Sequence, residues 1–313
     1  MCAVAHESDR LASAVTRVWP DGASKWEILG GGITNHNVKV TRPEGVFVLR
    51  VAGKGTELLG IDRDVEHAAT LAAAEAGVGP RVVRFIEPEG WLVTEFIEGA
   101  TPPPERLRRA DQLARVAAAL RAFHDGLVIP GRFETLEVVE AYRDTALERG
   151  ATLPAAFGEA YGLAQGIARL RAGEPRRPCH NDLLNANFLD DGARLRIVDW
   201  EYAGMGDPYF DLANFSINHE LDADGRATLL AAYTGRTRHE DLATIDLMRF
   251  MSDFREAMWG VVQGVVSELD FDFDGYAAEH FARMERTAAE PGFRAALDSG
   301  LKRRGAPERP STD

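Results

Sequence analysis

The chain of 313 residues is poor in cysteine, has no excess of basic residues and lacks a long apolar run. Its two cysteines, Cys2 and Cys179, are too few for a disulfide scaffold, and no CxxC pair indicates a zinc site. The 36 Lys and Arg residues stand against 49 Asp and Glu residues, and this net charge of −13 disfavours nucleic acid as a general partner. The longest apolar candidate, 261–266, is much shorter than the ~20 residues of a membrane span.

The N-terminal ten residues lack the basic and then apolar blocks of a signal peptide, so we expect a cytoplasmic protein. Hydrophobic residues make up 45% of the chain and charged residues 27%, a balance typical of folded globular proteins that excludes global disorder. The surplus of acids favours solubility, and where acids gather in one place they attract cations.

Residues before about 98 show the pattern of a small α+β lobe. Short β-type runs alternate with Gly-rich or Pro-containing turns, and a helical pattern at 63–76 is ended by Gly77. The segments expected to be strands are 26–29, 38–41, 46–51, 81–86 and 91–96. Such short strands, joined by turns and interrupted by one helix, indicate an antiparallel sheet.

A triple proline at 102–104 ends this pattern, because it continues neither a helix nor a central strand. Helical periodicity dominates beyond it, with long helical patterns at 242–269 and 276–289. We therefore expect two lobes and a tail. They are a nucleotide-binding lobe at 1–97, a catalytic and acceptor-binding lobe at 98–302, and a flexible tail at 303–313.

The polar stretch between the long helices contains the residues that suit catalysis. The segment 180–187 reads H-x-D-x4-N, and Asp199 follows Asn187 by twelve positions at the end of an apolar run. Asp182 suits a base that accepts the proton of an attacking hydroxyl, while Asn187 and Asp199 offer the oxygen ligands that Mg²⁺ prefers. The same residue types also occur in loops that only satisfy their own backbone, so the upstream sequence decides between these interpretations.

A Gly-rich turn and a strand cation lie upstream. Glycines between two strands let backbone N–H groups approach a phosphate. The candidate phosphate-binding residues here are Gly31, Gly32, Thr34 and Asn35. The turn is neither a Walker A loop nor a GxGxxG motif. Arg50 stands among apolar residues and suits phosphate binding when paired with Glu66 on the following helix, although an edge-strand charge in solvent is the simpler alternative.

The order of these parts resembles the eukaryotic-protein-kinase-like plan. The details resemble the choline/ethanolamine kinase family, within the aminoglycoside phosphotransferase and protein-kinase-like superfamily. The segments that carry the resemblance are 31–37, 49–51, 180–182, 199–203 and 210–214, and the likeness spans roughly 26–281. The resemblance implies an α+β, protein-kinase-like bilobal fold with a small antiparallel-sheet N-lobe and a larger, mostly helical C-lobe. It also implies ATP and Mg²⁺ as cofactors.

The resemblance assigns roles residue by residue. Asp182 matches the catalytic base, and the matching metal residues are Asn187, Asp199 and, as a second acid beside them, Glu201. Arg50 and Glu66 match the ion pair that holds the nucleotide phosphates. The matching hinge residues, whose backbone would bind the adenine edge, are Glu95, Phe96 and Ile97. Asp211 and His180 match residues that support the catalytic loop, whereas His124 is expected to be a packed structural histidine.

The acceptor residues are expected on a pair of C-terminal helices. Trp259 and Tyr276, with Tyr202, resemble the aromatic walls that bind a quaternary ammonium by cation–π attraction. Aromatic residues at helical spacing also suit a packed core. The chain has Glu256 where eukaryotic choline kinases have a second Trp. If Glu256 lines the acceptor pocket, it favours a primary amine or another polar cation over choline.

The sequence therefore predicts an ATP-dependent phosphotransferase that phosphorylates the hydroxyl of a small amino alcohol, choline or ethanolamine first. An aminoglycoside or sugar hydroxyl is the alternative acceptor. The acidic stretch 268–274 suits a polycationic drug and equally suits a solvated helix end. A nucleotide-binding pseudokinase is disfavoured because Asp182, Asn187 and Asp199 are all present. A metal phosphohydrolase fits the acidic cluster but leaves the Gly-rich lobe without a role.

Overall fold

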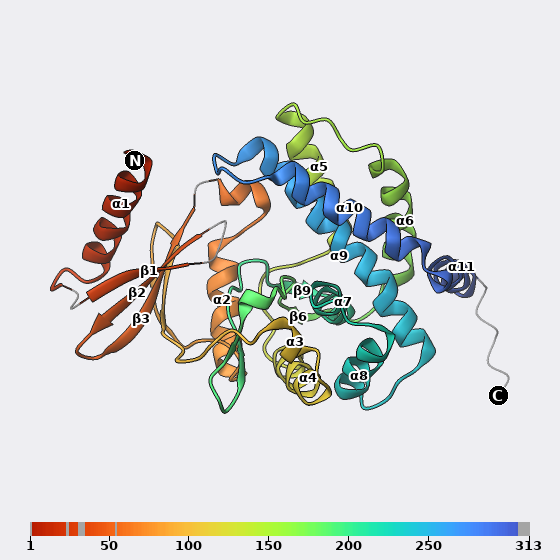
Figure 1. Cartoon of the computed structure of the whole chain (residues 1–313), viewed down its shortest axis with the longest axis horizontal. Coiled ribbons are helices and arrows are strands. Elements are labelled where there is room, and N and C mark those ends of the chain that lie inside the picture. The colour runs from red at the N-terminus through yellow and green to blue at the C-terminus, as the bar shows by residue number, and fades with distance from the viewer. Residues whose placement is uncertain (1, 23–24, 31–34, 54, 306–313) are drawn as a thin grey trace.

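The computed structural model describes residues 2–22, 25–30, 35–53 and 55–305, and it has two lobes (Figure 1). A five-stranded antiparallel sheet forms the smaller lobe, and most of the helices form the larger one. The predicted α+β architecture, a small antiparallel-sheet lobe and a larger, mostly helical lobe, is confirmed.

The sheet has the strand order β1-β2-β3-β5-β4. Its strands are β1 (Lys25–Leu29), β2 (Asn35–Arg42), β3 (Gly45–Ala52), β4 (Val82–Ile86) and β5 (Trp91–Glu95). Val38 pairs with Leu49 in the register, and both are fully buried on one face. Because side chains alternate along a strand, Arg50 and its partner Asn37 lie on the opposite face. The sequence predicted all five strands, since their alternation and turns are local signals.

Helix α1 (Cys2–Val18), which the sequence analysis did not predict, covers the outer face of the sheet (Figure 1). Its buried residues, among them Leu11 and Val15, form one hydrophobic core with Val38 and Leu49. The sheet therefore has an apolar face closed by α1 and a polar face that is left for the rest of the molecule.

Helix α2 (Arg63–Glu75) lies between the sheet and the larger lobe (Figure 1). The Asp62 side chain caps it by accepting from the backbone N–H groups of Asp64 and Val65 at 2.9 and 3.2 Å. Gly77, with φ of 74°, follows its last turn. The short 3₁₀ helix η1 (Thr56–Leu59) precedes it.

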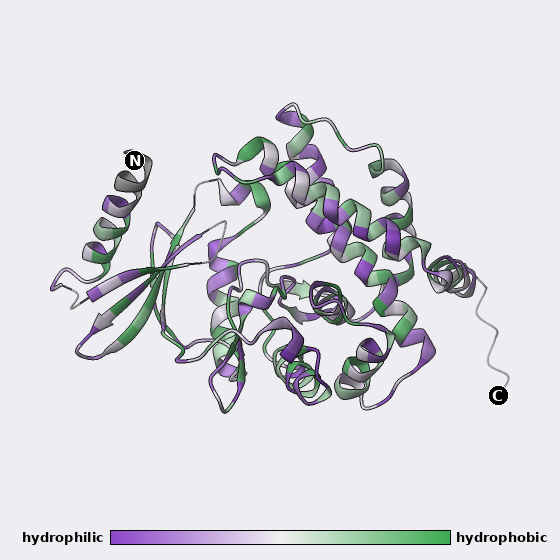
Figure 2. Ribbon diagram, viewed as in Figure 1, coloured by the Kyte–Doolittle hydropathy of each residue, from purple (hydrophilic) through white to green (hydrophobic). Residues whose placement is uncertain are grey.

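The larger lobe is built around the 28-residue helix α9 (His239–Val266), most of whose second half is buried. Helix α10 (Phe273–Ala289) packs along it (Figure 1). The other helices are α3 (Pro104–Leu107), α4 (Ala110–His124), α5 (Thr135–Glu148), α6 (Phe157–Arg171), α7 (Pro208–Asn218), α8 (Ala223–Thr234) and α11 (Pro291–Gly305). Hydrophilic and hydrophobic residues share the same helices, as expected for helices with one core-facing side (Figure 2).

Two short two-stranded antiparallel sheets position the polar loops of this lobe. Strand β6 (Arg177–Cys179) pairs with β9 (Gly204–Gly206), and β7 (Phe188–Asp190) pairs with β8 (Leu195–Ile197). The 3₁₀ helix η2 (Asn185–Asn187) enters β7. The loop after β6 and the loop after β8 are therefore held side by side.

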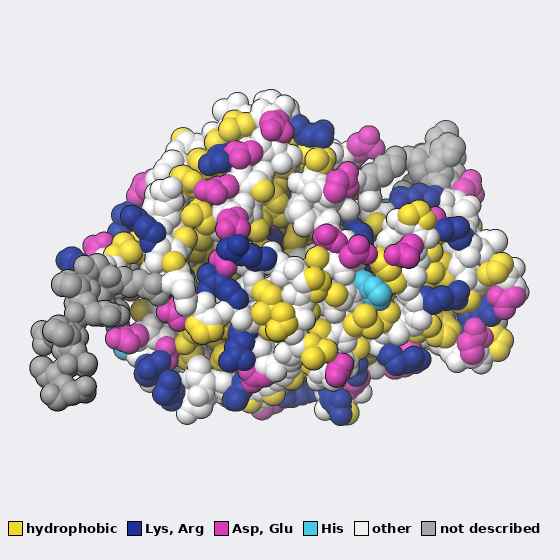
Figure 3. Space-filling view, turned by 180° about the vertical axis from the view of Figure 1, so that it is seen from behind, with side chains coloured by type: hydrophobic (Ala, Val, Ile, Leu, Met, Phe, Trp, Pro, Cys, Tyr) yellow, Lys and Arg dark blue, Asp and Glu magenta, His cyan; other side chains and the backbone are white. Residues whose placement is uncertain are grey.

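Helix α11 continues to Gly305, so the first residues of the expected tail are helical, and residues 306–313 lie outside the described part. Within the described ranges, no helix combines the length and the apolarity needed to cross a membrane. Basic and acidic side chains are interspersed over the face in Figure 3, so the surplus of acids forms no single patch there.

Candidate active site

Asp211 supports the loop that carries Asp182. It lies on α7 and is fully buried. Its Oδ2 atom accepts from the backbone N–H of His180 at 2.8 Å, and its Oδ1 atom accepts from that of Asn181 at 2.7 Å. The ring Nε2 atom of His124 lies 3.0 Å from Oδ2. Burial opposes the charge of Asp211, but the hydrogen bonds from His124 and His180 hold its pKa below the usual value.

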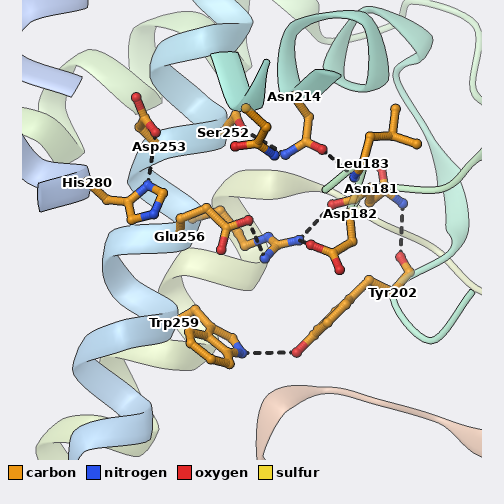
Figure 4. Close-up of polar contacts among 12 residues, drawn as sticks. Asn181, Asp182, Leu183, Tyr202, Asn214, Ser252, Asp253, Glu256, Trp259 and His280 are labelled. Atoms are coloured by element: carbon orange, nitrogen blue, oxygen red, sulfur yellow. Dashed lines mark hydrogen bonds and ion pairs between the residues drawn. The ribbon is translucent and has the colours of Figure 1, made fainter. Parts of the chain in front are cut away.

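His180 and Asn214 complete this support. The Nδ1 atom of His180 accepts from the backbone N–H of Asp182 at 3.2 Å, so its Nε2–H donates to the carbonyl of Val198 at 3.0 Å. Burial lowers the pKa of His180, which agrees with a neutral ring that orients the loop. The amide oxygen of Asn214 accepts from the backbone N–H of Leu183 at 2.6 Å (Figure 4).

Asp182 lies at the centre of the site (Figure 4). The side-chain amide of Asn187 donates to its carbonyl oxygen at 2.7 Å and lies 3.4 Å from its Oδ2 atom. Burial raises the pKa of Asp182 to about 8, although the neighbouring Arg255 opposes this shift. A carboxylate with a raised pKa is a stronger base than an ordinary aspartate, and such a group suits proton abstraction from a hydroxyl.

Arg50 joins the two lobes. Its Nε atom lies 3.1 Å from Glu66 on α2, and its Nη2 atom contacts Asp199 in the larger lobe. Burial opposes the charge of Arg50, but Asp199 and Glu66 hold its pKa above the usual value. Arg50 is therefore a largely buried cation between two acids, with a side chain that is 12% exposed, and the alternative of an edge-strand charge in solvent is wrong.

Glu201 is held by groups from the smaller lobe. Its Oε2 atom accepts from the Asn35 side-chain amide at 2.7 Å and lies 3.3 Å from Nη1 of Arg63. Arg63 also donates to the Asn35 amide oxygen at 3.0 Å and to Glu66 at 2.6 Å. In this conformation the Asn35 amide therefore contacts Glu201. The other predicted residues of the Gly-rich turn lie outside the described residues, namely Gly31, Gly32 and Thr34.

The donor set around Asp199 fits Mg²⁺. Because the amide nitrogen of Asn187 faces Asp182, its amide oxygen is the end that can bind a cation. Asp199 comes two positions after the end of strand β8, with Val198 between them. Its φ is 69°, a left-handed conformation that Asp and Asn adopt more readily than other non-glycine residues. Carboxylate and amide oxygens without a thiolate or a histidine cluster suit a hard divalent cation.

The predicted hinge begins at Glu95, the last residue of strand β5. The Phe96 backbone N–H donates to the carbonyl of Val46 at 2.9 Å, and the Glu95 side chain pairs with Arg81 at the surface. The Nζ atom of Lys39 lies 4.0 Å above the centre of the Phe96 ring. Within the described ranges, the Ile97 backbone N–H has no hydrogen bond to the protein.

The four predicted acceptor residues lie together, and we call them the acceptor group: Tyr202, Glu256, Trp259 and Tyr276. The indole N–H of Trp259 donates to the Tyr202 hydroxyl at 3.0 Å (Figure 4). The Tyr276 hydroxyl donates to Oε2 of Glu256 at 2.9 Å, and its ring contacts Trp259 edge to face. All four side chains are half-buried or buried.

Three charged or polar residues of the site were missed by the sequence analysis, namely Arg63, Asn214 and Arg255. Arg63 looked like an ordinary first residue of a helix, and Asn214 was noted only as part of a motif. Arg255 is the largest omission, because its guanidinium contacts both the loop that carries Asp182 and Glu256. A charged residue within the apolar pattern of α9 is the signal that would have identified it.

Comparison with known proteins agrees with this geometry. The sequence pattern of the APH phosphotransferase enzyme family matches residues 25–246, more than two thirds of the chain. The crystal structure of a choline/ethanolamine kinase family protein from Mesorhizobium loti superposes with a TM-score of 0.81 and 31% sequence identity. That match covers 94% of this chain and 99% of the other.

Two curated relatives are similar over long segments. Protein LicA of Haemophilus influenzae is 27% identical over 218 residues, a match that covers 66% of this chain and 62% of that protein. Probable choline kinase 3 of Arabidopsis thaliana is 25% identical over 321 residues, which cover 88% of this chain and 91% of that protein.

Proposed function

This chain belongs to the phosphotransferase enzyme family and is a small-molecule kinase, and we propose that it phosphorylates a small amino alcohol, choline- or ethanolamine-like, with ATP. The observation that carries the proposal is the position of the acceptor group beside Asp182, through Arg255 and Glu256. An aromatic and acidic wall next to a buried base suits a cation that bears a hydroxyl. The relatives that are named as choline or ethanolamine kinases support the same acceptor class.

The residues divide the chemistry as follows. Asp182 accepts the proton of the acceptor hydroxyl while the oxygen forms a bond to the γ-phosphorus. The bond between the γ-phosphorus and the β–γ bridging oxygen breaks, and ADP leaves. Mg²⁺, held by Asn187, Asp199 and Glu201 when bound, supplies charge neutralisation for the phosphates.

The smaller lobe carries the nucleotide in this proposal. Arg50, fixed by Glu66, binds the phosphates, the Gly-rich turn with Asn35 covers them, and the backbone of 95–97 binds the adenine edge. The functional boundary then falls near residue 98, with 1–97 binding ATP and 98–302 providing the base, the metal ligands and the acceptor group.

Release of ADP in the presence of Mg²⁺ tests the proposal, measured over a panel of choline, ethanolamine, aminoglycosides and sugars. We expect turnover with one or both amino alcohols, and at most a small residual rate in Asp182→Asn, which controls for background hydrolysis. Turnover confined to sugars or aminoglycosides would contradict the amino-alcohol acceptor. Absence of turnover with every acceptor, while ATP still binds, would favour a pseudokinase.

A further inference from the structure

Arg255 is a buried cation inside the site that the phosphotransfer chemistry does not by itself require. Arg255 is only 1% exposed, and it lies on α9 next to Glu256. Its Nη2 atom donates to the carbonyl of Asn181 at 2.6 Å and lies 3.4 Å from Oδ1 of Asp182. Its Nη1 atom lies 2.7 Å from Oε1 of Glu256.

Burying this guanidinium costs free energy of desolvation, which its contacts with the protein have to offset. Removing an arginine from water costs several kcal/mol, and ion pairs repay that cost only in good geometry. The compensating partners of Arg255 come from two separate elements, the loop at 181–182 and helix α9. The Tyr202 ring adds a third contact, with its centre 4.9 Å from the guanidinium carbon. Arg255 therefore ties the catalytic loop to the helix that carries half of the acceptor group.

We infer that Arg255 is a positioning and specificity-determining residue, which orients Asp182 toward the acceptor group and limits the acceptor site to a single positive charge. This inference rests on the proposed function, because it concerns the same reaction. Arg255 itself is too buried to contact an acceptor, so it acts through Asp182 and Glu256.

The positioning part follows from the contacts of the Asp182 carboxylate. Its Oδ1 atom faces Arg255 and its Oδ2 atom faces the Asn187 amide, each at 3.4 Å. Both contacts are long, so each oxygen keeps the capacity to accept a hydroxyl proton. The short bond to the carbonyl of Asn181, which has φ of 67°, fixes the loop from which the carboxylate extends.

The specificity part follows from the charges. Glu256 is already engaged at both oxygens, by Arg255 and by the Tyr276 hydroxyl. Asp182 and Glu256 together carry at most two negative charges against the one positive charge of Arg255, so at most one negative charge remains. The nearby acids Asp199 and Glu201 are themselves paired with Arg50 and Arg63. At most one charge is left to balance an ammonium group, because the other acids named here already form ion pairs with arginines.

The test compares Arg255→Gln and Arg255→Lys with the control Arg249→Gln. Arg249 lies on the same helix and is also paired with acids, Asp246 and Glu290, but it touches no residue of the site. We expect Arg255→Gln to lower kcat for ethanolamine by about 100-fold, the usual effect of a misplaced catalytic group, with KM for ATP unchanged. Arg255→Lys keeps the charge and should recover at least part of that loss.

The specificity readout uses two acceptors, ethanolamine with one charge and 1,3-diamino-2-propanol with two. In Arg255→Gln the ratio of kcat/KM for the dication to that for the monocation should rise by about tenfold, because a second negative charge is uncovered. The double variant Arg255→Gln/Glu256→Gln removes that extra charge. In this double variant the ratio of kcat/KM for the dication to that for the monocation should return to the wild-type value, while kcat stays low. The double variant should also fold if Arg255→Gln alone is destabilised by the uncompensated charge of Glu256.

The outcomes separate the two proposals. Wild-type turnover of ethanolamine, together with Arg255 variants that match Arg249→Gln in kcat and in the acceptor ratio, would overturn this inference alone. If the wild-type enzyme phosphorylates neither choline nor ethanolamine, the proposed function is overturned, and this inference with it. If kcat is as low in Arg255→Lys as in Arg255→Gln, the positive charge does not position Asp182, and this part of the inference is overturned.

Discussion

The Nε atom of Arg50 lies 3.1 Å from Oε1 of Glu66, and this ion pair connects strand β3 to helix α2. The Glu66 side chain is only 3% exposed and also binds Arg63 at 2.6 Å. Two guanidinium groups thus depend on one buried carboxylate, and Arg50 in turn reaches Asp199 in the larger lobe. The pair sets the position of the cation that is proposed to hold the nucleotide phosphates.

Glu66→Gln should therefore raise KM for ATP more than KM for the acceptor. Glu66→Gln loses the ion pair with Arg50 and the charge-assisted hydrogen bond from Arg63, and loss of such a bond costs about 1.5–3 kcal/mol, roughly a tenfold to hundredfold change. Steady-state kinetics with each substrate varied in turn checks this. Asp64→Asn, an exposed acid in the same first turn, is the control. Equal KM values for ATP in Glu66→Gln and Asp64→Asn would contradict the proposed role of the pair.

Asp182→Asn should lose most of kcat while ATP binding is retained. The amide cannot accept the hydroxyl proton, and general-base catalysis is typically worth about 10²–10⁴-fold. Nucleotide affinity, measured by calorimetry, should match the wild type, since Asp182 lies on the acceptor side of the proposed phosphate site. Asp190→Asn, which alters a structural acid paired with Arg115, controls for loss of folding. Turnover within a few-fold of the wild type would remove Asp182 from the role of base.

The sequence predicted the parts of the molecule whose signals are local. The five strands and α2 follow from alternation, turns and caps. The loop residues Asp182, Asn187 and Asp199 were selected by their spacing in one short segment, and their roles stay a prediction. Helix α1 was missed because its apolar residues pack against the apolar face of the sheet, a contact that its own sequence pattern does not reveal. Tertiary packing, rather than propensity, decides such an element.

Arg255 shows why the rest of the site was not predictable. Within α9 it is one charged residue in an apolar pattern, and nothing near it in sequence explains its burial except Glu256. Its other partners, Asn181 and Asp182, lie more than 70 positions earlier in the chain. Only the fold brings the catalytic loop against this turn of α9, so the ion network that joins them is a tertiary property.

Trp259→Ala should raise KM for choline more than KM for ethanolamine. A quaternary ammonium has no N–H to donate and depends on aromatic faces, and a cation–π contact is worth about 0.5–2 kcal/mol, roughly 2- to 30-fold in affinity. Trp259→Phe keeps a ring but removes the N–H that Tyr202 accepts at 3.0 Å, so it should lie between the wild type and Trp259→Ala. Equal KM changes for both amines would indicate that Trp259 only packs the core.

His219 should make the fold sensitive to acid. It is fully buried, its Nδ1–H donates to the carbonyl of Phe215 at 2.9 Å, and its Nε2 atom has no hydrogen-bond partner in the described part of the chain. Burial lowers the pKa of His219 to about 4, against 6.5 for the unfolded chain. Between these values the unfolded state binds a proton that the folded state does not, so the free energy of unfolding falls as the pH falls.

His219→Asn replaces the ring with an amide that still donates a hydrogen bond but does not titrate in this range. Urea unfolding at pH 7 and pH 5 checks the prediction. The wild type should lose about 2 kcal/mol more of its free energy of unfolding between these pH values than His219→Asn, at no more than about 1.4 kcal/mol per pH unit. Comparing the two proteins cancels the carboxyl groups that also titrate near pH 5. Equal losses in both would mean that His219 binds its proton as readily in the folded protein as in the unfolded chain.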